Sequence, residues 1–386
     1  MSKKSLFSKY ALIGENLELK QNVNFELTPD GKILNLLYDD IDSVMKISSN
    51  DSNFLMVPGF INSHIHIGDS FAKEKGFNMN LNEVVAPPYG LKHELLRNVT
   101  KDLKLTAIKN AILEMLSNGI TCFVDFRERG IEGINILKEA LKDSPIFFLI
   151  LGRFKNSTDV ESIFTHANGI GLVSYDNISP KIKETLKICK EKSKKLIACH
   201  CAELVRDDSL IKEMCDDDLV DIIVHGTQFT REDLEIIKKK KKALILCPRC
   251  NGYFGVGFPP INEISRLEIP ISLGTDNVMA NSTDLFEEMR YLYRISRVLD
   301  KKQKISAKEL LKMVTINAAK NFKMEEDIGS ISENKYANVF IVNLDEPNLY
   351  TSNLDYETML PLIVQRCNAS NIKKTYIKGE LVFEKS

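Results

Sequence analysis

The sequence predicts an α/β protein, a (β/α)8 TIM barrel flanked by a small β-sandwich domain that the N- and C-terminal segments form together. Three observations predict this architecture. Apolar, strand-like runs alternate with amphipathic helical runs eight times between residue 61 and about residue 328. Short strand-like runs recur at both ends of the chain, outside that rhythm. Polar residues stand where several of the alternating runs end.

The N-terminal segment contains short runs of alternating apolar and polar residues, at 23–27 and 32–37. Similar runs return near the other end, at 338–342, 374–378 and 380–384, where Lys378-Gly379 is typical of a turn. A few strands seldom fold alone, so we expect the two ends to pair with each other. The expected domains are residues 1–57 with 329–386, as a composite β-sandwich, and residues 58–328, as the barrel.

The barrel strands are expected where apolar runs of strand length occur, at 61–66, 120–125, 146–151, 169–174, 196–200, 220–225, 243–247 and 269–274. Helical patterns lie between them, among them 103–117, which Gly119 ends, and 180–192. Thr230, Asp284 and Ser306 each precede an acidic residue three positions on, which is typical of a helix N-terminus.

Length and charge exclude several classes of protein. The 386 residues are 44% hydrophobic, enough for a large core, and 52 basic against 53 acidic residues leave a formal net charge of −1. This balance argues against a partner that is nucleic acid or a membrane surface. Residues 1–9 are polar, unlike a signal peptide, and no apolar run approaches the ~18 residues of a membrane span. We therefore expect a cytoplasmic protein.

The eight cysteines are expected to stay reduced and to pack as small apolar residues, because the chain is long and shows no secretion signal. Cys247 and Cys250 have the spacing of half a structural zinc site or of a redox pair. No second Cys-x-x-Cys motif completes a zinc site, so packing is the favoured interpretation of this pair.

Candidate metal ligands are spread over the ends of the expected strands. His64 and His66 stand two apart on one strand, so their side chains share a face. His200, His225 and Asp276 end or follow later strands. In a barrel of parallel strands these carboxyl ends meet at one face, where the active site lies. Imidazole and carboxylate are ligands of catalytic zinc or iron, so the pattern predicts a metal-dependent hydrolase.

Five motifs resemble the amidohydrolase superfamily and occur in its order; the nearest branch is that of the cytosine deaminases and chlorohydrolase-like enzymes. They read Pro-Gly-Phe-Ile-Asn-Ser-His-Ile-His (58–66), His-Cys-Ala-Glu (200–203), His-Gly (225–226), Cys-Pro-Arg-Cys-Asn (247–251) and Leu-Gly-Thr-Asp-Asn (273–277). The resemblance covers nearly the whole chain. It implies a hydrolytic deaminase, in which a metal-activated hydroxide attacks the amino-bearing carbon of a nucleobase-like or other amino-heterocycle and ammonia leaves.

The resemblance and the residue types together imply a role for each polar residue. One divalent ion, Zn²⁺ or Fe²⁺, is expected to be held by His64, His66, His200 and Asp276. Asp276 is also expected to take a proton from the activated water, which His225 orients. Glu203 is expected to carry a proton to a ring nitrogen and then to the leaving ammonia; the alternative interpretation is a helix-start cap.

The chain also departs from the pattern of the family at several positions. Other branches hold two metal ions bridged by a carboxylated lysine at the end of the fourth strand, whereas this strand ends Ser174-Tyr175, which implies a single ion. Ser174-Tyr175-Asp176-Asn177 stands where deaminases of this branch often carry a His-Ala-Pro-type segment after the fourth strand. Cys250 stands in place of the usual serine of a Cys-Pro-x-Ser-Asn segment. Both departures argue against an adenosine- or homocysteine-type substrate.

Substrate specificity is expected in the long segment 68–96, because long loops of barrels are often functional. This segment contains His93, and Arg127 and Arg153 follow the second and third strands. The candidate substrate-binding residues are Glu203, His225, Arg153 and His93. Either arginine, Arg127 or Arg153, could face the pocket and bind a carbonyl or anionic group, with a surface salt bridge as the alternative for each. The expected partner is a small heterocyclic substrate. Enzymes that the chain resembles are commonly dimers or larger, which makes a homo-oligomer the family expectation.

Two other functions remain open. The same site could hydrolyse another C–N bond or a C–Cl bond, in which case a group other than ammonia would leave. A non-catalytic descendant would only bind a ligand. All the expected metal ligands and Glu203 are present, which argues against that second alternative. The metal content of the purified protein would distinguish an enzyme from such a ligand-binding descendant.

Overall fold

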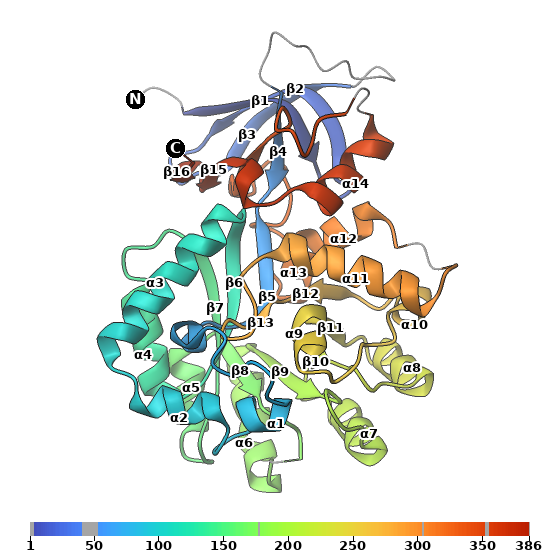
Figure 1. Ribbon diagram of the computed structural model, residues 1–386. Helices are drawn as coiled ribbons and strands as arrows, with labels where there is room; N and C mark the ends of the chain where they lie inside the picture. The colour runs from blue at the N-terminus through green and yellow to red at the C-terminus, as the bar shows by residue number, and fades with distance from the viewer. Residues whose placement is uncertain (1–3, 41–52, 177, 303–304, 352–354, 386) are drawn as a thin grey trace.

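The computed structural model describes residues 4–40, 53–176, 178–302, 305–351 and 355–385. Figure 1 shows two parts of the chain, one above the other: a sheet that draws strands from both termini, and a curled sheet of parallel strands with helices around it. Strand β4 (Phe54–Pro58) lies in the first sheet, and β5 (Phe60–His66) follows it directly in the second. The single residue between them, Gly59, passes so close to Thr121 that a Cβ would lie 2.2 Å from the threonine Oγ1.

Within the described residues, the parallel sheet has nine strands in the order β12-β11-β10-β9-β8-β7-β6-β5-β13. All eight expected strands are present, with small differences at their ends. Their bounds are β5, β6 (Ile120–Arg127), β7 (Phe147–Gly152), β8 (Gly169–Leu172), β9 (Leu196–Cys201), β10 (Ile222–His225), β11 (Ala243–Leu246) and β12 (Ile271–Leu273). The ninth strand, β13 (Asp276–Asn277), follows β12 after only Gly274 and Thr275, yet it pairs with β5 at the other end of the order.

Helices alternate with these strands and cover the outside of the parallel sheet (Figure 1). They are α3 (Lys101–Ser117), α4 (Gly130–Ala140), α5 (Val160–His166), α6 (Pro180–Ser193), α7 (Asp208–Asp216), α8 (Arg231–Lys239), α9 (Pro248–Tyr253), α10 (Ile261–Arg266), α11 (Leu285–Leu299), α12 (Ala307–Met313) and α13 (Ile316–Asn321). The expected N-caps are confirmed, because Thr230, Asp284 and Ser306 each accept a hydrogen bond from the first turn of α8, α11 and α12.

The segment after β5 folds into three short helices that cross the carboxyl ends of the parallel strands. They are η1 (Ile67–Ala72), α1 (Leu81–Val85) and α2 (Leu91–Asn98). Asn80 and Glu83 form a capping box that starts α1. This segment brings side chains from outside the sheet toward the end of β5.

The terminal strands form one continuous seven-stranded sheet among the described residues, in the order β16-β15-β14-β4-β1-β2-β3. Their bounds are β1 (Ser5–Ile13), β2 (Glu18–Leu27), β3 (Ile33–Asp39), β14 (Val339–Asn343), β15 (Ile372–Ile377) and β16 (Glu380–Glu384), with β4 in the middle. Both ends of the chain therefore contribute, as expected. The strands of the two ends join in one sheet because β4 pairs with β1 on one side and with β14 on the other.

A shared apolar core joins the two parts of the molecule. One face of the terminal sheet buries Tyr10, Leu12 and Leu55 in the same cluster as residues of the parallel sheet and its helices. Phe60, the first residue of β5, lies at the junction. Its ring contacts Phe286 of α11 and Phe340 of β14, with centroids 5.0 and 4.8 Å away. The helix α14 (Tyr356–Arg366) packs beside α11 and α12. Among the described residues, no helix combines the length and the apolar character needed to cross a bilayer.

Candidate functional site

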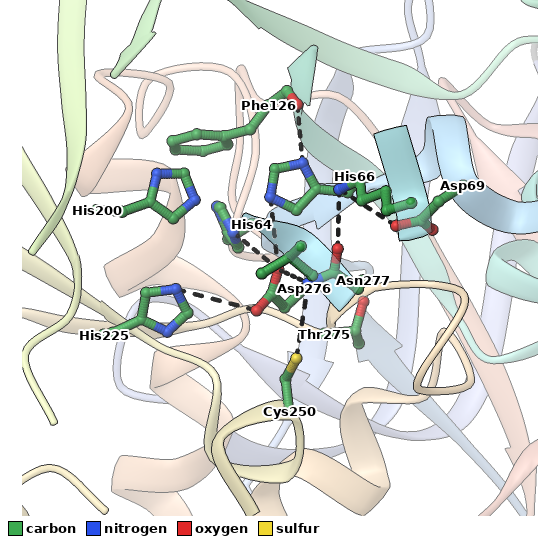
Figure 2. Close-up of polar contacts among 12 residues, drawn as sticks. His64, His66, Asp69, Phe126, His200, His225, Cys250, Thr275, Asp276 and Asn277 are labelled. Carbon is green, nitrogen blue, oxygen red and sulfur yellow. Dashed lines mark hydrogen bonds and ion pairs between the residues drawn. The ribbon is translucent and has the colours of Figure 1, made fainter. Parts of the chain in front are cut away.

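Four imidazoles and one carboxylate converge at the carboxyl ends of the parallel strands (Figure 2). They come from four strands that are distant in sequence, and they are His64 and His66 of β5, His200 of β9, His225 of β10 and Asp276 of β13. Two overlapping sets could hold a metal ion, since the ligand atoms within each lie within 4.8 Å of one another. One set is His64, His66 and His200; the other is His64, His225 and Asp276. The structure therefore brings all five predicted residues together.

Asp276 lies at the centre of the cluster. Its Oδ1 is 3.2 Å from Nε2 of His64 and 3.5 Å from Nε2 of His66, and its Oδ2 is 3.9 Å from Nε2 of His225. Burial opposes ionisation of this carboxyl, but the contact with His64 and the neighbouring imidazoles outweigh it and hold the pKa of Asp276 well below its ordinary value of 3.8. Asp276 is thus a buried carboxylate, which is stable only with cationic or hydrogen-bonding partners.

The hydrogen bonds of two histidines determine which ring nitrogen carries the proton. Nδ1 of His66 donates to the carbonyl of Phe126 at 2.9 Å, and Nδ1 of His200 donates to the carbonyl of Leu172 at 2.7 Å. Each Nε2 therefore presents a lone pair. Burial lowers the pKa of His66 to about 3 and that of His200 well below 6.5, so both rings are neutral, as metal ligands must be.

The arrangement of lone pairs fits a bound cation. Nε2 of His200 is buried and has no hydrogen-bond partner among the described residues. Nε2 of His66 faces the carboxylate oxygen of Asp276, so two acceptors lie 3.5 Å apart. Buried acceptors that face each other without a donor are costly, and a divalent ion between them removes that cost. The donor set of imidazole nitrogens and one carboxylate suits zinc or iron.

His225 differs from the other three imidazoles because an amide donates to its ring. Nδ2 of Asn251 lies 3.2 Å from Nδ1 of His225, so that Nδ1 accepts and Nε2 carries the proton. This N–H points toward Oε2 of Glu203, at 3.5 Å, and Oδ2 of Asp276. Both His225 and Asp276 have a positive φ, of 74° and 61°, a conformation that costs energy in non-glycine residues and is found at functional sites.

Glu203 follows β9 and lies beside the imidazoles. Burial, and then the negative charge of Asp276, raise the pKa of Glu203 to about 8. A carboxyl with such a pKa can both give and take a proton near neutral pH. The alternative interpretation, that Glu203 caps a helix, is wrong. Asp207 caps α7, because its side chain accepts a hydrogen bond from the backbone N–H of Leu210.

A cavity of about 200 Å³ opens onto these groups. Its lining joins the cluster to the helical segment after β5 and consists of His66, Leu81, Asn82, Val85, Ala86, Pro87, Lys92, Arg153, Val173, His200, Glu203, His225, Asp276 and Asn277. Arg153 is therefore in the lining, and its Nε is buried without a hydrogen-bond partner among the described residues. A second hollow of about 400 Å³ shares His200 and Glu203 with this cavity.

Two other candidate contacts lie outside that lining. His93 points to the backbone, with Nε2 3.1 Å from the carbonyl of Val85, and its neighbour Lys92 reaches the cavity in its place. Arg127 is buried, donates from Nε to the carbonyl of Gly133 at 2.9 Å and lies 3.6 Å from Asp125. It is neither on the surface nor at the cavity.

Sequence reasoning missed three further polar residues in the lining, Asn82, Lys92 and Asn277. Asn277 belongs to the same motif as Asp276, and its Nδ2 donates to Oδ1 of Asp276 at 3.0 Å. That motif was the available signal for Asn277, whereas nothing in the sequence distinguishes Lys92 from a solvent-exposed lysine.

The cysteines are free and buried, as expected. Cys250 is close to the site, with Sγ 3.8 Å from Nδ2 of Asn277 (Figure 2). Burial raises the pKa of Cys247 and of Cys250 well above 9, so both thiols are protonated and act as packing groups.

Comparisons with known proteins agree with this geometry. The profile of the amidohydrolase family matches residues 55–382. An uncharacterized protein of Methanocaldococcus jannaschii is 34% identical over 337 residues, which cover 82% of this chain and 85% of that protein. A 5-methylthioadenosine/S-adenosylhomocysteine deaminase of Thermoanaerobacter pseudethanolicus is 25% identical over 395 residues, 93% of this chain and 86% of the other.

A solved structure has the same fold. The crystal structure of an adenosine deaminase from Xanthomonas campestris, with bound zinc, superposes with a TM-score of 0.82 at 15% identity. The superposition covers 98% of this chain and 92% of that one.

Proposed function

The chain belongs to the amidohydrolase family and is thus a hydrolase of carbon–nitrogen bonds, and we propose that its reaction is the hydrolytic deamination of an amino-heterocycle. The observation that carries the proposal is the position of Glu203. Its carboxyl, with a pKa raised to about 8, lies 3.5 Å from His225 at a cavity that the metal-ligand cluster also lines. Deamination needs a group that moves protons from water to a ring nitrogen and to ammonia.

We infer that the parallel sheet closes into a (β/α)8 barrel. β12 pairs with β11 and β13 pairs with β5, and two residues separate β12 from β13, so we regard both as halves of the eighth strand. Closure would explain how β5 and β13 bring their ligands together. The barrel in this proposal comprises residues 58–328.

We likewise propose that residues 1–57 and 329–386 form one composite β-sandwich. Contacts between segments near the two edges of the terminal sheet support this proposal. A Cβ on Gly379, in the turn between β15 and β16, would lie 2.2 Å from Cδ1 of Leu27 at the end of β2. The backbone N–H of Ala337 donates to the carbonyl of Gly31, in the turn before β3. The sheet must curl strongly for these contacts to form.

In this proposal one divalent ion, Zn²⁺ or Fe²⁺, is held by His64, His66, His200 and Asp276. The lone pairs of His66 and His200 and the charge of Asp276 support this set. When bound, such an ion activates water at neutral pH and stabilises negative charge on oxygen. A single ion is proposed because no lysine stands at the end of β8, where the chain continues Val173-Ser174-Tyr175.

The remaining residues manage protons and the substrate. Asp276 would accept the proton of the attacking water, and His225 would donate its Nε2 proton to hold that water and its developing charge. Glu203 would give its proton to the ring nitrogen next to the amino-bearing carbon, take up a proton of the attacking water and pass that proton to the leaving ammonia. The other proton of the water would restore Glu203 to its protonated form. Arg153, whose Nε has no partner, would bind a carbonyl or anionic oxygen of the substrate.

A substrate panel tests the proposal. The zinc-loaded protein is incubated with amino-purines, pterins, pyrimidines and triazines, some with chloride in place of the amino group, and ammonia and chloride are measured. Ammonia from at least one ring, lost in Glu203→Gln, supports deamination. Release of a different group alone would replace it by another C–N or a C–Cl hydrolysis. No turnover together with no bound metal would indicate a protein that only binds a ligand.

A further inference from the structure

A lysine from outside the parallel sheet penetrates to the metal-ligand cluster. Lys92 lies on α2, in the segment that crosses the carboxyl ends of the strands, and only 2% of its surface is exposed. Its Nζ has three polar neighbours: Oε1 of Glu128 at 2.5 Å, Oδ1 of Asn277 at 2.8 Å and Oδ2 of Asp69 at 3.3 Å. The contact with Asn277 is a hydrogen bond, and the contacts with Glu128 and Asp69 are ion pairs with buried carboxyl groups.

The first neighbour connects Lys92 to one of the histidines. Glu128 follows β6, is buried, and places Oε1 2.9 Å from Nδ1 of His66. Burial acts to raise the pKa of Glu128, but Lys92, His66 and Arg153 together hold it well below 4.5. The Nδ1–H itself donates to the carbonyl of Phe126, so Glu128 acts through its charge: an anion beside Nδ1 keeps the proton on that nitrogen and leaves Nε2 free to bind a metal ion.

The second neighbour connects Lys92 to the carboxylate of the cluster. Asn277 directs its oxygen toward Nζ of Lys92 and its Nδ2 toward Oδ1 of Asp276, at 3.0 Å (Figure 2). The ammonium can only donate and the carboxylate can only accept, so the amide has one orientation that satisfies both. Lys92 and Asp276 together therefore fix which way the amide of Asn277 faces.

We propose that Lys92 is a positioning residue that acts on His66 through Glu128 and on Asp276 through Asn277 at the same time, so that the segment of α2 takes part in building the metal centre. The inference rests on the metal site of the proposed function, and not on the identity of the substrate. It gives the helical segment after β5 a second task beside lining the cavity.

Replacing Lys92 by methionine keeps a long side chain but removes the charge and all three donors. Glu128 then remains as a buried carboxylate without its cation, and the amide oxygen of Asn277 loses its donor. Loss of a hydrogen-bonding partner of this kind lowers metal affinity about 10–100-fold in other proteins, and we expect a loss of that size here.

The experiment measures metal binding by the full-length protein, without turnover. The metal-free wild type and Lys92→Met are titrated with Co²⁺ and with Zn²⁺ in competition with a chromophoric chelator. We expect weaker binding of both ions by the variant and a changed visible spectrum of bound Co²⁺, because the spectrum reports ligand geometry. Lys104→Met is the matched control, since Lys104 is also a buried helical lysine, on α3, where its charge faces Arg129 and Glu132.

A double variant separates positioning from general stability. Lys92→Met with Glu128→Gln removes both charges of the buried pair and so restores folding if the single change impairs it. The proposal requires that metal affinity stays low in the double variant while its thermal stability recovers. The proposal would be overturned if metal affinity and thermal stability both recovered in the double variant. It would also be overturned if Lys92→Met showed the same metal affinity and the same Co²⁺ spectrum as the wild type. A wild type that binds neither ion would instead refute the metal site and with it the proposed function.

Discussion

The Nε2 atom of His64 lies 3.2 Å from Oδ1 of Asp276, although 212 positions separate the two residues in the chain. Their strands pair in parallel, with Asp276 opposite Ile65. Gly274 permits this approach, because a Cβ there would lie 2.6 Å from Cβ of His64. The contact joins the first strand of the parallel sheet to the last, so the cluster exists only in the folded chain. The predictions below concern what this cluster and its surroundings do.

Glu203→Gln should retain the metal and lose turnover. Glutamine has nearly the same shape but cannot exchange a proton, so ammonia release should fall about 10²–10⁴-fold, the usual contribution of a general acid–base group. Steady-state kinetics and metal analysis of the same preparation check both parts. Glu191→Gln, an exposed change on α6, is the control and should leave both unchanged. Full activity of Glu203→Gln would rule out the proton-transfer role.

His200→Ala should lose the metal ion. The residue supplies a buried Nε2 that has no protein partner, so its removal deletes a ligand and leaves a gap that water fills. Elemental analysis after dialysis should find far less zinc or iron per chain than in the wild type. His166→Ala is the matched control, because this exposed histidine on α5 bonds to the carbonyl of Ser162 and takes no part in the cluster. Equal metal content in the two variants would contradict the ligand role.

The strands and their ligands could be predicted because the relevant signal is local. A run such as 60–66 shows the strand, and a spacing of two places His64 and His66 on one face without knowledge of the rest. The capping boxes of α8 and α12 are equally local, since a side chain three residues away completes them.

The role of Lys92 could not be predicted, because it depends on how α2 lies across the strand ends. His93, next to it, has the more informative chemistry in sequence but faces the carbonyl of Val85. α14 was also missed; it contains Pro361, and proline disfavours a helix interior. In each case contacts between distant segments outweigh the local preference.

Arg153→Met should weaken the binding of substrates that carry an oxygen. The guanidinium of Arg153 lines the cavity, and its Nε has no hydrogen-bond partner among the described residues. A carbonyl or anionic oxygen of the substrate would therefore accept a hydrogen bond from it. A hydrogen bond to a charged group contributes about 1.5–3 kcal/mol, so kcat/KM should fall roughly 10–100-fold. A ring without such an oxygen should show a smaller loss. Arg129→Met is the control, as Arg129 pairs with Glu132 on the outside. Equal losses for both kinds of ring would argue against this contact.

Glu288→Gln should change how stability depends on pH. Glu288 lies on α11 and is fully buried; its Oε2 accepts from the backbone N–H of Arg249 at 3.2 Å. Burial raises its pKa from 4.5 to about 8, although Arg249 acts in the opposite direction. Between these two values the folded protein holds a proton that the unfolded chain releases, so the wild type loses stability as pH rises through this window.

Glutamine has no proton to release, so the stability advantage of Glu288→Gln over the wild type should grow from about pH 5 to about pH 8. The growth should be on the order of a few kcal/mol, since each pKa unit corresponds to about 1.4 kcal/mol. Chemical denaturation at several pH values measures it. Glu287→Gln is the neighbouring control, because Glu287 lies on the same helix with a half-exposed carboxylate that pairs with Arg290. An advantage of Glu288→Gln that stays constant, or shrinks as pH rises, would show that Glu288 is ionised in the folded protein.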